Sequence, residues 1–285
     1  MSMTKMTNMI NPEVMGDMIS AKITALLKIT PYAKVDTSLQ GVPGDTKTVP
    51  SWNFIGAAED VAEGAAITTK KLTASSTTFK VKKAMQSVGI TQESINSGMG
   101  DPVGAGENQL AKAIAVKLDA DVLAAALTAT LKHDGSASKI SYDGIVDAVG
   151  VLDEEENTDK VMFVAPAQVT TMRKDANFID KNKYGNDVMV TGEIGMIGNT
   201  RIVPSKQIVA ADGKYVCPII KLEPASVETE YAETELPAIT IFLKKDIQVD
   251  HEWFPKTQTH DITAAKYYGV ALTNAAKVVL ATFKA

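Results

Sequence analysis

The spacing of apolar residues at the start of the chain is helical. Asn11 followed by Pro12 suits the cap and first turn of a helix, and Pro31 predicts its end. Residues 1–10 are rich in Met and are interpreted as a mobile tail. The apolar face consists of Val14, Met15, Met18, Ile19, Ile23, Leu26 and Leu27. Two interpretations stay open: a helix packed on its own core, or an arm that crosses onto a neighbouring molecule.

A polar ribbon of two strands is predicted next. Residues 46–55 and 72–83 are rich in Thr and also hold Val, Phe and Trp, which favour strands, and the acidic stretch 56–64 lies between them. These runs hold too few large apolar side chains to close a core, and an isolated pair of strands is marginal in water. We therefore expect another copy of the chain to supply the surface that covers the ribbon, which indicates an assembly protein.

One long helix follows the ribbon, after a short strand at 88–90 and a polar turn at 94–100. Asp101-Pro102 marks its start, and residues 133–135 mark its predicted end. It would be about thirty residues and roughly 45 Å long. Lys117 and Asp121 are spaced to form an ion pair on its surface. Its apolar side consists of Leu110, Ile114, Leu118, Val122, Ala126 and Leu127. This length is typical of a strut.

Helices and strands alternate after residue 140, which predicts a compact α/β unit. Helices are expected at 143–156 and 167–175, and strands at 161–164, 202–204 and 215–222. Strands predominate afterwards, at 227–231, 239–243, 247–253, 266–272 and 277–283. The long helix and these late strands are expected to form one elongated domain that the α/β unit interrupts. The fold class is α+β.

The composition of the chain limits the classes of function that it can have. The 285 residues carry a net charge of −5, which argues against a surface devoted to gripping phosphates. Cys217 is the single cysteine, so no internal disulfide is expected; its apolar surroundings predict a buried, inert thiol. We expect no membrane association, because no apolar run reaches the ~18–20 residues that span a bilayer. No signal peptide is recognised, and assembly in a cytoplasm is expected.

Catalytic and metal-binding patterns are incomplete. His251-Glu252 resembles the start of a zinc-protease motif, but Pro255 stands where the second His is needed. Gly104-Ala105-Gly106 lacks the third glycine of a nucleotide loop. An enzyme built on the α/β unit would need titratable groups that converge in a cleft. We therefore expect neither a catalytic site, a cofactor nor a metal.

Charged clusters have two interpretations each. The acid run 153–156 suits a solvated helix end, with a cation site or a basic group of a partner as the alternative. Lys80, Lys82 and Lys83 end the second ribbon strand, where charge blocks unwanted strand pairing. They could instead face acids of a neighbouring subunit in the 56–64 stretch. The candidate contacts between subunits are Trp52, Phe54, Glu59, Asp60, Glu63, Phe79, Lys80, Lys82 and Lys83. Trp52 and Phe79 could also pack on the subunit's own long helix.

Several short motifs occur in a particular order. They are Gly44-Asp45-Thr46, Val49-Pro50, the stretch 59–64, Leu72, Val81-Lys82-Lys83, Asp101-Pro102, the stretch 266–272 and Lys277-Val278-Val279. In this order the chain resembles the tailed-phage major capsid proteins, which share the Hong Kong ninety-seven capsid fold with encapsulin shells. The resemblance covers nearly the whole chain.

The resemblance implies an N-terminal arm at 1–35 and an extended hairpin loop at 36–90. It implies a peripheral domain made of a spine helix at 91–135 and late strands at 224–285, and an inserted axial domain at 136–223. Hexamers and pentamers would close into an icosahedral shell around double-stranded DNA that is held without sequence-specific binding. An encapsulin-type compartment with a protein cargo is the alternative.

The same resemblance implies further partners. The arm begins close to residue 1, so scaffolding is expected from a separate protein, unless the chain is a processed form, and a portal is expected as well. We expect no covalent cross-links between Lys and Asn side chains, because no motif for them is recognised. The protein would be part of the virion capsid and would assemble in the cytoplasm of a bacterial host.

Overall fold

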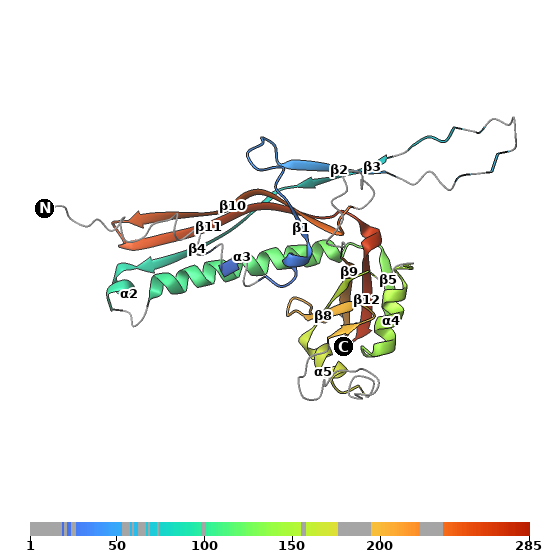
Figure 1. Ribbon diagram of the computed structural model, residues 1–285. Coiled ribbons are helices and arrows are strands. Elements are labelled where there is room, and N and C mark those ends of the chain that lie inside the picture. The colour runs from blue at the N-terminus through green and yellow to red at the C-terminus, as the bar shows by residue number, and fades with distance from the viewer. Residues whose placement is uncertain are drawn as a thin grey trace.

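Figure 1 shows the computed structural model, in which a long layer of strands lies over one long helix. A compact α/β unit is attached at one end of this helix. The structure describes residues 19, 22–23, 27–52, 58, 60–61, 67, 69–72, 74–97, 101–154, 158–175, 195–222 and 236–285. The strand predicted at 227–231 lies outside this range, as does most of the helix predicted from Asn11.

The long layer is a sheet of four strands in the order β1-β10-β11-β4. Their bounds are β1 Lys34–Asp36, β4 Lys82–Thr91, β10 Ile239–Phe254 and β11 Thr259–Leu272. β10 and β11 form one long hairpin, and β4 pairs with β11 from Lys82 to Thr91. The sequence predicted a break between 243 and 247 and a strand only at 88–90. The strand at 88–90 is present as the end of the longer β4. The predicted break was wrong, because bulges between Leu243 and Gln248 carry β10 through the charged segment without ending it.

The spine helix α3 spans Pro102–Ala126, with Asp101 as its cap: the carboxylate accepts a hydrogen bond from the Val103 N–H at 3.1 Å. The start is as predicted. The predicted end near residue 133 is wrong, because β5 (Leu131–Gly135) leaves the helix to pair in parallel with β12 (Val278–Lys284). The turn predicted at 94–100 is also wrong in part, since α2 covers Gln92–Ser97.

The compact unit holds a sheet of six strands in the order β5-β12-β9-β6-β8-β7. Its other elements are β6 Lys160–Val164, β7 Met196–Ile197, β8 Thr200–Pro204, β9 Lys214–Lys221, α4 Tyr142–Gly150 and α5 Pro166–Met172. Residues 161–164 are buried, as their apolar sequence predicted, and Lys160, which begins the strand, is buried as well. The expected boundaries at 136 and 223 need correction, because β5 and β12 lie outside them and still belong to this sheet.

One hydrophobic cluster joins the two parts. Leu118 and Val122 of α3 pack with Phe163 of β6 and with Val278 of β12. The short helix η2 (Thr30–Tyr32) adds Tyr32, whose ring meets that of Phe163 edge-on at 5.6 Å between centroids. Because the same side chains serve both parts, the compact unit is anchored to the C-terminal half of the spine helix.

The described part of the N-terminal segment also packs on its own chain. Ile19 and Ile23 are buried against Leu110 and Ile114 of α3. Lys22 donates a hydrogen bond to Glu107 at 3.2 Å, which ties the same segment to the helix. For these residues the structure supports the interpretation of a segment packed on its own core.

The acid run 153–156 does not end a helix, because α4 stops at Gly150. Glu154 instead accepts hydrogen bonds from Lys160 at 2.5 Å and from Lys221 at 3.0 Å. Burial alone would raise the pKa of Glu154, but the bonds from Lys160, Lys221 and Thr158 hold the pKa below its ordinary value. Lysines of the same chain therefore neutralise this carboxylate, where the sequence suggested a solvated end.

Cys217 is fully buried in β9, as predicted. Its thiol donates a hydrogen bond to Gln168 Oε1 at 3.1 Å, and burial raises the pKa of the thiol to about 12. A thiolate is the reactive form, so this cysteine is inert in the folded chain. Among the described helices, none is both long and apolar enough to cross a membrane.

Candidate assembly surface

The predicted ribbon exists and projects from the body (Figure 1). Its strands are β2 (Thr46–Trp52) and β3 (Ala74–Lys80), paired from Thr46↔Lys80 to Trp52↔Ala74 in a sheet of their own. Pro50 lacks an N–H and is tolerated because β2 is an edge strand. Thr48 and Thr78 share a hydrogen bond across the strands at 3.1 Å. Within the described residues, these strands pair only with each other.

The base of the ribbon is attached to the long sheet. Phe79 stacks on Phe242 of β10 with ring centroids 6.0 Å apart. Leu39, Ala271, Val49 and Val81 complete this small cluster. Phe79 therefore contacts its own subunit, though on β10 and not on the spine helix as the alternative interpretation had it. The side chains of Trp52 and Phe54 lie outside the described residues.

The three lysines occupy different places from those the sequence suggested. The ribbon strand ends at Lys80, and Lys82 and Lys83 begin β4. Lys82 Nζ lies 2.7 Å from the carboxylate of Asp121 on α3, and Lys83 Nζ lies 5.6 Å from the centre of the Tyr267 ring. The contact of Lys82 is thus within its own chain, because the chain leaves the ribbon at Val81 and continues as β4, which pairs with β11 of the long sheet.

The remaining charged candidates lie at the ribbon. Lys80 is 76% exposed and lies 3.6 Å from Asp45, a separation typical of a weak surface pair. Asp60 is exposed, while Glu59 and Glu63 lie outside the described residues. A contact of Lys80 or Lys83 with acids of another subunit stays a prediction.

Asp121 joins the spine helix to strands β11 and β4 of the long sheet. It accepts hydrogen bonds from Tyr268 Oη at 2.6 Å, from Lys82 Nζ at 2.7 Å and from Lys117 Nζ at 3.0 Å. Burial alone would raise the pKa of Asp121, but these bonds hold it below its ordinary value. The sequence predicted only the Lys117 pair, because the helical spacing shows it; Tyr268 and Lys82 arrive from distant strands.

We expect Asp121→Asn to lower the free energy of unfolding by about 1–3 kcal/mol at neutral pH, because buried charged hydrogen bonds are lost. Since the folded pKa is depressed, the carboxylate stabilises the fold above 3.8, its ordinary value, and stops doing so as the pH falls through the folded pKa. The difference between wild type and variant should therefore shrink in acid. Urea unfolding at several pH values measures it.

Asp45→Asn is the matched control for that measurement. Asp45 is 64% exposed beside Lys80, so its loss should change the free energy of unfolding by less than about 0.5 kcal/mol. An Asp121→Asn difference that stays constant from neutral to acid pH would mean that the ionised carboxylate is not the stabilising form.

A second carboxylate of α3, Asp119, binds residues 28–30, where the N-terminal segment leaves the spine helix. Oδ1 accepts from the backbone N–H groups of Ile29 at 3.2 Å and Thr30 at 2.9 Å, and from the Thr30 hydroxyl at 2.6 Å. Oδ2 accepts from the Lys28 N–H at 2.9 Å. The buried charge is thus fully hydrogen-bonded, and it fixes η2 to the spine. Sequence reasoning missed it, since a lone Asp in a helix gives no signal.

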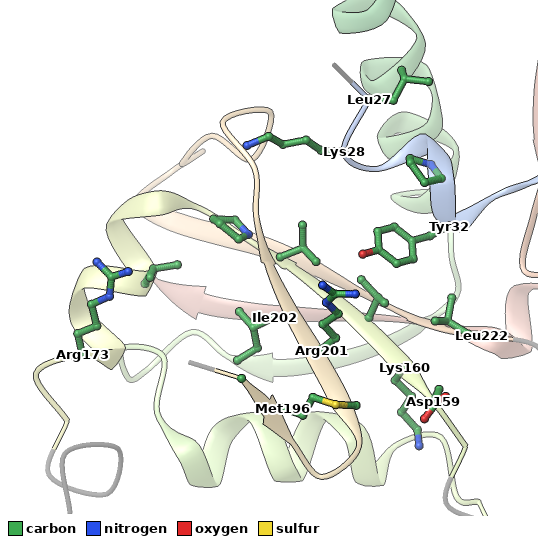
Figure 2. A pocket seen from close by; sticks show the side chains of 16 residues that line it. Leu27, Lys28, Tyr32, Asp159, Lys160, Arg173, Met196, Arg201, Ile202 and Leu222 are labelled. Carbon is green, nitrogen blue, oxygen red and sulfur yellow. The ribbon is translucent and has the colours of Figure 1, made fainter. Parts of the chain in front are cut away.

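Figure 2 shows a cleft between the segment from Lys28 to Tyr32 and the compact unit. Its volume is about 890 Å³, and its walls carry Lys28 and Tyr32 on one side and Arg201 and Ile202 of β8 on another. Among the described residues, its one acidic lining side chain is Asp159, which accepts from Asn199 at 2.7 Å. The described lining therefore holds no pair of carboxylates, the feature that would favour acid–base catalysis.

The projecting ribbon, the spine helix under a long sheet and the inserted α/β unit together define the capsid fold of tailed phages. The capsid asymmetric unit of cyanophage Pam1 superposes with a TM-score of 0.68 at 11% identity, over 93% of this chain and 92% of that one. The virus-like particle of Pyrococcus furiosus has the same fold, with a TM-score of 0.62 at 11% identity, over 94% and 98% of the two chains.

Sequence comparison is more specific than the fold. The family described as phage capsid protein matches residues 73–281. The major capsid protein of Staphylococcus phage phiMR11 is 31% identical over 281 residues, which is 98% of this chain and 95% of that relative. The chain therefore belongs to the phage capsid protein family, which confirms the resemblance seen in the sequence.

Proposed function

We propose that this phage capsid protein assembles through hexamers and pentamers into an icosahedral shell that encloses double-stranded DNA. The observation that carries the proposal is the ribbon. Its two strands project from the body and, among the described residues, pair with no third strand. A ribbon of this kind is marginal in water by itself, so a neighbouring subunit is the natural surface for it.

The contact is made by the outer part of the ribbon. Because Phe79 and Lys82 hold the base to the subunit itself, they orient the ribbon more than they bind the neighbour. Trp52, Phe54 and the acids Glu59, Asp60 and Glu63 are the proposed contacts with the next subunit. Lys80 and Lys83 are proposed to set the register of that contact.

The net charge of −5 is compatible with a shell that confines its contents without binding them tightly. A strongly basic inner wall would trap DNA at its phosphates, with an affinity that depends on salt. The proposal therefore includes DNA held without sequence-specific binding, no catalytic activity, a separate scaffolding protein and a portal. The subunits would assemble in the cytoplasm of a bacterial host and end in the virion.

An encapsulin-type compartment is less favoured. The Pyrococcus furiosus particle shares the fold at 11% identity, which carries no argument about contents. The relative at 31% identity over nearly the whole chain is a phage major capsid protein. The phage function therefore has the stronger support.

The test is particle formation by the full chain, expressed alone and together with its neighbouring scaffolding gene. Sedimentation and electron microscopy should reveal closed shells, or rings and tubes when the scaffolding protein is omitted. Subunits that remain monomeric in both expressions would exclude the proposal. Shells that retain a co-encoded protein cargo, with none of the chain present in phage particles, would favour the compartment instead.

A further inference from the structure

The outward face of α4 carries apolar and acidic residues side by side. Tyr142 and Val146, one helical turn apart, are 38% and 43% exposed. Asp143 and Asp147 follow them at the same spacing and are exposed as well. A helix that covers a sheet turns its apolar residues to that sheet, as Ile145 does here. The outward face therefore holds a small apolar patch, flanked by two carboxylates, beyond what packing on the sheet requires.

The cleft in Figure 2 has the complementary composition. Its walls include the apolar side chains of Tyr32 and Ile202, and its exposed cations include Lys28 and Arg201. Within the described part of the chain, neither of these two cations forms a side-chain ion pair. Asp159, the one acid among the described lining residues, already accepts a hydrogen bond. The cleft is therefore suited to an apolar surface that brings negative charge with it.

The cleft and the outward face of α4 lie on opposite sides of the six-stranded sheet (Figure 1). Side chains alternate along β6, so that Val161 belongs to the cluster of Tyr32 on the cleft side, and Met162 packs with Ile145 under α4. A subunit therefore cannot place its own α4 in its own cleft. A contact between the two surfaces joins two copies head to tail, and such contacts form a closed ring when the rotation between copies allows it.

We propose that the outward face of α4 docks in the cleft of the next copy of the chain around a ring. Tyr142 and Val146 enter between the apolar walls, and Asp143 and Asp147 face the cations of the cleft. The inference rests on the proposed shell, because it names the surfaces that join subunits within a hexamer or a pentamer. It concerns the compact unit and is separate from the contact proposed for the ribbon.

The two surfaces also agree in size and in the roles of their side chains. The cleft, at about 890 Å³, has room for several side chains of one helix face. The Tyr142 ring offers a large apolar area and a hydroxyl that can form a hydrogen bond, which is why tyrosine is common at interfaces. Charge pairs at the edge of such a contact fix its register and exclude wrong partners more than they add affinity. Reversal of these charges should therefore block the contact.

Charge reversal on each surface of the full-length chain tests the contact. The acid-reversed variant carries Asp143→Lys with Asp147→Lys, and the cation-reversed variant carries Lys28→Glu with Arg201→Glu. Like charges then meet across the interface, so each variant should yield about tenfold fewer rings and shells than wild type. All four substitutions together restore opposite charges and should restore most of the yield. Sedimentation and electron microscopy measure the yield, under the conditions in which wild type assembles.

Co-expression of the two reversed variants gives a sharper result. The basic α4 of the acid-reversed variant fits the acidic cleft of the other variant, and the unchanged α4 of that second variant fits the unchanged cleft of the first. The two kinds of subunit can therefore alternate around a ring of six, but not around a ring of five. We expect hexamers, sheets or tubes, with few closed shells, because the proposed shell needs pentamers to close.

Lys174→Glu is the matched control, because Lys174 is an exposed cation of the same unit outside the cleft lining, and it should assemble like wild type. Circular dichroism should show every variant folded; if a double variant is not, the single changes Asp147→Lys and Arg201→Glu replace it. Reversed variants that assemble like wild type would overturn the contact and leave the proposed shell intact. A fourfold variant that stays unassembled would also overturn it, and would assign the cleft to a different protein. A wild-type chain that forms no particles would contradict the proposed function itself, and the contact with it.

Discussion

Replacing residues 53–73 with Asn-Gly is expected to give a subunit that folds normally and forms no shells. Trp52 and Ala74 are directly paired at the outer end of the described ribbon, so a two-residue turn can join them. Asn-Gly suits the type I′ turn that such hairpins favour. None of the described core residues comes from 53–73, so removal of this stretch should leave the hydrophobic clusters intact.

The measurements for this shortened ribbon are circular dichroism with thermal unfolding, and sedimentation with electron microscopy. A midpoint within a few degrees of wild type, together with only free subunits or capsomers, is the expected result. The control replaces 53–73 with a Gly/Ser linker of equal length, which separates the reach of the ribbon from its side chains. Shells formed at wild-type yield by the shortened variant would contradict the role proposed for the ribbon.

Local signals in the sequence predicted those elements whose neighbours in space are also neighbours in the chain. The cap at Asp101-Pro102, the ribbon at Thr46 and the apolar strand β6 were all visible from composition and spacing. The end of the spine helix could not be predicted from composition and spacing. Residues 131–135 leave the helical path because β12, from the far end of the chain, pairs with them in parallel. No pattern in the sequence around residues 131–135 indicates that such a distant strand will pair with them.

The candidate sites divide in the same way. Lys117–Asp121 was predicted because a helix brings residues four apart together, while Tyr268 joins the same carboxylate from another strand. His251 was noticed only as a single residue beside Glu252. Alternation along Val249, His251 and Trp253 would have placed His251 on the apolar face. The hairpin register that pairs His260 with Trp253, and so brings it beside His251, depends on the turn between the strands.

The spine helix uses two carboxylates for two attachments. Asp121 holds the long sheet through Tyr268, and Asp119 holds the exit of the N-terminal segment through Thr30. Two residues apart on a helix, they point to different sides, so each attachment can be weakened separately. Loss of the Asp119 carboxylate should destabilise the fold more than loss of the Asp121 carboxylate. Three of the four donors to Asp119 are backbone N–H groups, which stay in place and lose their acceptor when the side chain is replaced.

We expect Asp119→Ala to lower the free energy of unfolding by about 3 kcal/mol or more, since each buried backbone N–H left without an acceptor costs about 1–3 kcal/mol. Hydrogen exchange should also show that amides 28–30 lose protection before the rest of the subunit opens. Urea unfolding gives the first quantity. The N-terminal segment should become the preferred site of limited proteolysis.

Asp119→Asn is the informative partner variant. Its carbonyl oxygen can still accept from Thr30, but its NH₂ group would face the Lys28 N–H, donor against donor, so the loss should be intermediate at about 1–2 kcal/mol. Asp143→Ala is the control, because Asp143 is exposed in the first turn of α4 and should cost only about 0.3–1 kcal/mol. If the Ala and Asn variants at 119 matched this control, and amides 28–30 stayed protected, Asp119 would not be what fixes the segment to the spine.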